Sequence, residues 1–262
     1  DQSLARLDDS NTLIRAGASE AIGYFSDADS EKGIEKALHD TDRLVRQAAL
    51  RGLSYQPSKG RTALVKEFLN LKNISEQERS EAYETLARIS PESMEDVIGQ
   101  LLGLVSNGKG DTRRESLFRA ARLAPSDERV IKALRGELQS TDSSTLVVAI
   151  RHLASLGDKT AKSEVGRFLS HADGMVRAAM VQSLHDLCPE RVWDILERVL
   201  STDKNSNVQR AAVEEARILR GPSAIILLEK VAGTAAYEKE VVDTAKNALD
   251  FLRGKPPQAY CR

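Results

Sequence analysis

The stretch "DTDRLVRQAALRGL" at residues 40–53 returns in altered form as "HADGMVRAAMVQSL" at residues 171–184. In both copies an Asp is followed three residues later by Val and then Arg, and small or apolar residues stand four and eight positions after the Val. Residues spaced four apart share one face of an α-helix. The stretch therefore predicts a short amphipathic helix that the chain uses more than once.

The pattern recurs every 31–35 residues from one end of the chain to the other. We name its first apolar position the anchor; it falls at Ile14, Val45, Glu78, Arg113, Thr145, Val176, Val208 and Val241. Three residues before the anchor stand Asn11, Asp42, Ser75, Gly110, Asp142, Asp173, Asn205 and Glu238. Six of these are Ser, Asp or Asn, whose side chains accept hydrogen bonds from the first amides of a helix, and Ser75 with Glu78 predicts a capping box. The predicted helices cover residues 11–25, 42–55, 75–89, 111–124, 142–156, 173–187, 205–220 and 238–253.

Between these helices lie seven further apolar-periodic segments, so each repeat is predicted to be a helical hairpin. They cover residues 31–38, 61–71, 91–105, 127–138, 161–169, 189–200 and 223–231, and Pro91, Pro189 and Pro222 are expected at first helical positions. One hairpin cannot bury its own apolar face, so neighbours must stack. We therefore predict an all-α superhelix (solenoid) of about eight hairpins over residues 1–262, with a long loop at 105–116 and an extended tail at 254–262.

Composition narrows the class of protein. The 262 residues are 41% hydrophobic and 29% charged, aromatic residues make up 4%, and the formal net charge is −1. A balanced charge removes the general electrostatic reason to expect nucleic acid or an anionic membrane as a partner. No run approaches the roughly 18 apolar residues of a membrane span. We expect a soluble protein, either cytoplasmic or exported with its signal removed, and the sequence leaves this choice and the oligomeric state open.

The repeat resembles the HEAT family, in particular the short bacterial variety related to phycobilin-lyase-type repeats. Its signature is similar to D-x-x-V-R-x-x-A-x-x-x-L, which Asp42, Val45, Arg46, Ala49 and Leu53 match in full. The resemblance implies a scaffold that binds a partner, and in a minority of members an enzyme. It also implies that the repeated arginine pairs with an Asp or a carbonyl of the adjoining turn and does not bind phosphate; this arginine is Arg15, Arg46, Arg79, Arg114 and Arg177.

Catalytic and metal-binding patterns are scarce. None of the four histidines stands in an H-E-x-x-H or His-Glu arrangement, and no phosphate-binding loop or nucleophile elbow occurs. His185 and Cys188 share a helix face, as half of a metal site would. We expect no catalytic residue, metal or cofactor. Two enzymatic alternatives remain: a phycobilin-lyase-like subunit, and a DNA alkylation glycosylase, which would need a basic groove with aromatic side chains.

In HEAT solenoids the second helix of each hairpin lines the concave face, so side chains two, six and nine positions after the anchors are expected to be exposed there. The middle of this surface is basic, whereas Asp243 and Asp250 make the last repeat acidic. The candidate partner-binding residues are Arg51, Arg119, Arg122, Val147, Arg151 and His185. Because arginine favours carboxylates, we predict a non-enzymatic scaffold that binds an acidic segment of a partner protein and no nucleic acid.

Overall fold

The computed structural model describes residues 2–253, in which every regular element is a helix. The helices that follow the capping residues are α2 (Thr12–Ile22), α4 (Arg43–Leu53), α6 (Glu76–Ile89), α8 (Gly110–Leu123), α10 (Ser143–Ser155), α13 (Gly174–Val181), α16 (Ser206–Leu219) and α18 (Lys239–Leu252). The helices between them are α3 (Ala28–Leu38), α5 (Lys59–Leu69), α7 (Met94–Asn107), α9 (Glu128–Glu137), α11 (Lys159–Ser163), α12 (Val165–Leu169), α15 (Val192–Thr202) and α17 (Pro222–Ala232). Shorter elements are α1 (Gln2–Ala5), η1 (Arg6–Asp8), η2 (Pro91–Ser93) and α14 (Leu184–Leu187). The tail predicted at 254–262 lies outside the described residues.

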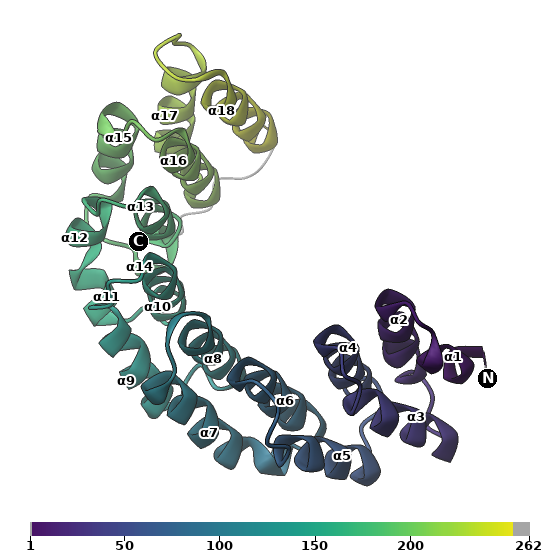
Figure 1. Ribbon diagram of the computed structural model, residues 1–262. Coiled ribbons are helices and arrows are strands. Elements are labelled where there is room, and N and C mark those ends of the chain that lie inside the picture. The colour runs from purple at the N-terminus through teal and green to yellow at the C-terminus, as the bar shows by residue number, and fades with distance from the viewer. Residues whose placement is uncertain (1, 254–262) are drawn as a thin grey trace. The chain divides into compact units, whose positions relative to one another are not determined.

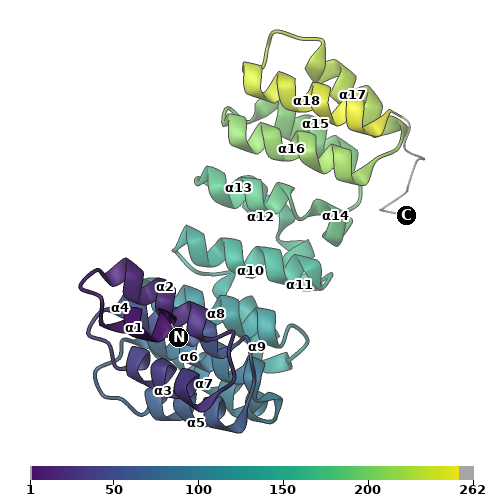
Figure 2. The ribbon, with the colours of Figure 1, turned by 90° about the vertical axis from the view of Figure 1, so that its right-hand side faces the viewer.

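The chain forms two compact units, Asp1–Ala124 and Pro125–Arg262. In the first unit α2 packs on α4, α4 on α6 and α6 on α8; in the second, α10 packs on α13, α13 on α16 and α16 on α18. Figures 1 and 2 show these helices side by side in each unit, with the helices between them forming a second layer. We call the eight helices that follow the capping residues the second helices, because each is the second helix of its hairpin.

The core of both units is the predicted helical stripe. The residues four and eight positions after every anchor are all buried; they are Ala18, Ala49, Ala82, Leu117, Ala149, Met180, Ala212 and Ala245, and Ile22, Leu53, Leu86, Ala121, Leu153, Leu184, Ala216 and Leu249. Small residues dominate the first row, which lets neighbouring helices approach closely. The prediction of an aliphatic core at this spacing is confirmed.

The predicted helix starts are confirmed at the six positions with a Ser, Asp or Asn. Each of these side chains accepts a hydrogen bond from an amide of the first turn, and the capping box of Ser75 and Glu78 is present. The other two positions have no side-chain cap, but their helices begin within one residue of the predicted starts at 111 and 238. Glu238 makes no capping hydrogen bond, and Gly110 is the first helical residue of α8, with φ +50.

Four of the five repeated arginines contact an acidic side chain or a carbonyl of an adjoining turn, as the resemblance implied, whereas Arg114 pairs with Asp111 and Glu115 of its own helix. Arg177 donates to both carboxylate oxygens of Asp203 (2.7 and 3.0 Å) and to the carbonyls of His171 and Ala172. Arg15 does the same with Asp40, and Arg46 with Glu78 and two carbonyls. These guanidinium groups are mostly buried against protein oxygens, so the set is not a phosphate-binding surface.

Two local predictions are wrong. The stretch 105–116 is not a long loop, because α7 continues to Asn107 and α8 starts at Gly110, which leaves a two-residue connection. The longest repeat interval is taken up by fourteen-residue helices instead. Pro91 and Pro222 do occupy first helical positions, but Pro189 precedes α15 by three residues.

A buried arginine closes the first two hairpins of the first unit. The Arg61 side chain is fully buried and donates to the carbonyls of Gly23 (2.9 Å), Gly52 (3.2 Å) and Phe25. A side chain at Gly23 would meet the Gly52 backbone at 2.4 Å. One guanidinium thus binds carbonyls at the ends of both α2 and α4, and the Gly52 carbonyl also accepts the Tyr55 amide.

Candidate binding groove

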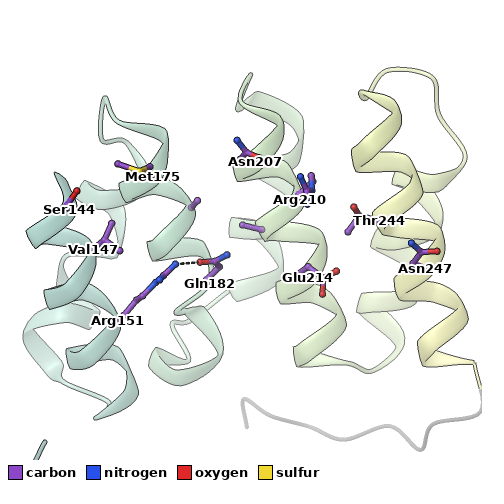
Figure 3. Close-up of a pocket in the computed structure, with 12 residues that line it drawn as sticks. Ser144, Val147, Arg151, Met175, Gln182, Asn207, Arg210, Glu214, Thr244 and Asn247 are labelled. Atoms are coloured by element: carbon purple, nitrogen blue, oxygen red, sulfur yellow. Dashed lines mark hydrogen bonds between the residues drawn. The ribbon is translucent and has the colours of Figure 1, made fainter. Parts of the chain in front are cut away.

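A groove of about 620 Å³ crosses the second helices of the second unit. Figure 3 shows its lining side chains, which come from α10, α13, α16 and α18. The lining residues are Ser144, Val147, Arg151, Met175, Ala178, Gln182, Asn207, Arg210, Ala211, Glu214, Thr244 and Asn247. Val147, Ala178 and Ala211 give a small apolar floor, and the other side chains are mostly polar. Hydroxyls, amides and a guanidinium above an apolar floor suit a ligand that has a polar backbone and side chains of both kinds.

Local structure explains how these side chains reach the groove. Asp142, Asp173 and Asn205 fix the starts of α10, α13 and α16 by capping, so the helices begin in register. Residues one position before the anchor, and two and six after it, then fall on the same stripe of each helix. That common register is why Ser144, Met175 and Asn207 stand in one row.

The sequence prediction found two of these rows and missed one. Val147 and Arg151 line the groove as candidate residues should. The row before the anchor was missed. Its sequence signal was Met175, an unbranched apolar side chain two residues after the capping residue Asp173, and 57% of its surface is exposed. The predicted exposure of residues nine positions after the anchor was wrong in part, since Gly23, Ala87 and Ala154 are buried. It was also wrong for Ser80, two positions after its anchor, which is buried.

Some charged side chains of the groove have an oppositely charged partner among the described residues, and Arg151 does not. Arg217 lies 2.6 Å from Glu214, and Arg210 lies 3.5 Å from Glu240. Arg151 donates to the amide oxygen of Gln182 at 2.8 Å (Figure 3). Within residues 2–253 it has no carboxylate within ion-pair distance. Arg151 is therefore an exposed cation held in place by a neutral partner.

His185, another candidate residue, lies behind this face. Helix α13 ends at Val181 and α14 begins at Leu184. This break leaves the backbone amide of His185 without a helical partner, and the amide donates to the buried Glu215 carboxylate of α16 at 2.5 Å. The same carboxylate lies 3.1 Å from His185 Nδ1. Burial raises the pKa of Glu215, and the contact with His185 opposes that rise. His185 is thus tied into the packing between α14 and α16.

The remaining candidates lie in the first unit. Arg119 pairs with Glu84 (2.9 Å) and Glu115 (2.9 Å) and has 11% of its side chain exposed. Arg122 also pairs with Glu84, and Arg51 pairs with Glu20 at 3.0 Å. Arg51 and Arg119 line a smaller pocket of about 360 Å³, as Glu81 and Glu84 also do. The charge of these three arginines is therefore largely neutralised by carboxylates of the protein.

Two further findings bear on the kind of site. Across residues 2–253, no group of three or more His, Cys, Asp and Glu side chains is placed to hold a metal ion. No helix in that same part of the chain has both the length and the apolar character that crossing a membrane demands.

Comparison with known proteins identifies the class. The model of the family described as HEAT repeats matches residues 1–76, 128–217 and 167–250. These ranges make up more than half of the chain, so the chain belongs to the HEAT-repeat family and its fold is the α-α solenoid of that family. None of the curated protein sequences matches it.

Solved structures agree on the fold. The X-ray structure of Escherichia coli YibA is similar over 95% of this chain and 92% of that chain, with a TM-score of 0.64 and 16% identity. Kap121p bound to Pho4p is similar over 96% of this chain and 32% of that chain, with a TM-score of 0.67 and 12% identity. The CpcE–CpcF phycocyanin lyase complex from Nostoc has a TM-score of 0.40 at 14% identity over 95% of this chain and 93% of that chain, which is too low to support an argument.

Proposed function

We propose that this chain is a non-enzymatic binding module whose second unit holds an extended segment of a partner protein in the groove across α10, α13, α16 and α18. The observation that carries the proposal is the groove itself: an apolar floor from α10, α13 and α16, with polar side chains from these helices and from α18 around it. Side-chain amides and hydroxyls can hydrogen-bond a peptide backbone whatever its sequence. The floor accepts small apolar side chains.

Helix packing sets the length of segment that fits. Packed helices lie about 9 Å apart, so the three steps from α10 to α18 span about 27 Å. An extended chain rises about 3.3 Å per residue, which corresponds to about eight residues. Because three of the four lining helices have capped starts and all four have buried residues in the core, the groove is formed before the segment arrives, and that lowers the entropic cost of binding.

Arg151 gives the segment its first chemical requirement. Its guanidinium is exposed and has a neutral protein partner, so a carboxylate of the segment can form a charge-assisted hydrogen bond there. The proposed ligand is thus an acidic segment, as the arginine pattern predicts. The residue that we propose binds its carboxylate is Arg151, in place of Arg119 and Arg122. The structural neighbour Kap121p was solved bound to Pho4p; at 12% identity the likeness concerns the fold, and the groove chemistry supports the proposal.

A displayed library of random nine-residue peptides tests the proposal. The purified chain should enrich a common pattern, and a synthetic peptide with that pattern should bind in a titration. Ala178→Arg places a long side chain on the groove floor and should weaken binding by about tenfold or more. The matched control is Ala133→Arg, since Ala133 is a partly exposed alanine of α9 outside the groove; it should bind as the unmodified chain does. Failure to enrich any pattern, or equal binding by Ala178→Arg, would overturn the proposal.

A further inference from the structure

The two ends of the groove carry opposite charges. On α18 the exposed face presents Glu240, Asp243 and Asp250 beside the lining residues Thr244 and Asn247. Glu240 faces Arg210, and Asp250 lies 2.9 Å from Arg253. Asp243 has no cation within ion-pair distance among residues 2–253. At the α18 end, the Asp243 carboxylate is therefore the one negative charge of these three without an ion-pair partner among the described residues.

Asp243 is exposed next to Thr244, which lines the groove, but does not line the groove itself. It stands two positions after its anchor, as Val147, Ala178 and Arg210 do on the three other helices, and all of those line the groove. Arg151 stands at the opposite end, on α10. Between the two ends the charges are matched, because Arg210 pairs with Glu240 and Arg217 with Glu214. Among the described residues, the groove thus has a cation without an ion-pair partner at its α10 end, and Asp243, an anion without one, stands beside its α18 end.

We infer that the groove accepts its peptide segment in one direction, with an Asp or Glu over Arg151 on α10 and a Lys or Arg over Asp243 on α18, about eight residues apart along the segment. This inference rests on the proposed function. A reversed segment would place like charges together at both ends, and such contacts set specificity more than affinity. The matched charges between the ends require only a neutral or small central sequence.

Two synthetic peptides of equal composition test the direction. The first carries the enriched central residues with Asp at the end expected over α10 and Arg at the other; the second exchanges these two residues. The unmodified chain should bind the first peptide about tenfold more tightly at low salt, and added salt should reduce the preference. The exchanged chain Arg151→Glu with Asp243→Arg should prefer the second peptide.

The neutral variants Arg151→Gln and Asp243→Asn provide a second test that does not introduce new charge. Each should lower the preference between the two peptides, while circular dichroism shows unchanged helicity. If the unmodified chain binds both peptides equally and Ala178→Arg still abolishes binding, the direction is wrong and the groove stands. If no peptide binds, the proposed function and the direction fail together.

Discussion

Arg177 Nε donates to Asp203 Oδ2 across 2.7 Å and so joins α13 to the turn that precedes α16. Asp203 also accepts the backbone amide of Asn205, the residue that caps α16. Arg15 of α2 and Asp40, in the turn that precedes α4, repeat this arrangement, with the Asp42 amide in the place of the Asn205 amide. One arginine thereby positions the cap of the next repeat.

Replacing Arg177 tests this role. Arg177→Gln removes two charge-assisted bonds to Asp203 and two bonds to carbonyls, and should lower the free energy of unfolding by about 2 kcal/mol in urea denaturation. Arg177→Lys should recover only part, because a lysine cannot form the paired contact. Arg191→Gln is the control: Arg191 is largely exposed and pairs with neighbouring Asp194, so an unfolding midpoint lowered as much as by Arg177→Gln would contradict the account.

The same pair predicts a pH dependence. Burial alone would raise the pKa of Asp203, but hydrogen bonds from Arg177 and the Asn205 amide outweigh it, so the pKa lies below its ordinary value of 3.8. The folded state then binds fewer protons than the unfolded state, and the stabilisation is present above that ordinary value and lost as the pH falls through the folded pKa. The stability difference between the unmodified chain and Asp203→Asn should therefore be large at neutral pH and shrink below about pH 4. A difference that stays constant from neutral to acid pH would rule this out.

Arg61 should matter more than any exposed arginine. Arg61→Met leaves the buried Gly23 carbonyl without its donor and removes one of the donors to the Gly52 and Phe25 carbonyls, which should cost about 3 kcal/mol. Lys59→Met, two residues away and exposed, serves as the control in thermal unfolding. Equal melting temperatures for the two variants would show that the carbonyls find water or other donors.

Glu78 explains why one repeat has a charged anchor. It is buried, closes the capping box of α6 and accepts Arg46 at 2.7 Å. Glu78→Leu restores an apolar anchor but should still destabilise the first unit by about 2 kcal/mol, since Arg46 loses its carboxylate. A double-mutant cycle with Arg46→Leu should show a coupling of at least about 1 kcal/mol; additive effects would mean that the pair contributes nothing of its own.

Some of these features could be predicted from the sequence because they are local. A capping Asp and a stripe at four-residue spacing act within one helix, so Asp142 and Ala149 have the same role in the structure as in the pattern. Arg119 and Arg122 differ, because their partners Glu84 and Glu115 depend on how α6 lies against α8. The exposure of Met175 likewise depends on the rotation of α13 in its layer. The sequence pattern describes single repeats, so it could not predict the contacts between neighbouring helices.

Photo-crosslinking tests the central claim most directly, using a library-selected peptide with a central benzophenone and peptide mapping of the product. Benzophenone reacts readily with methionine, and the chain offers Met94 in the first unit, exposed Met175 in the groove and buried Met180. We predict that the crosslink falls on Met175 and that Ala178→Arg prevents it. A crosslink on Met94, or one on Met175 that Ala178→Arg leaves unchanged, would contradict binding in this groove.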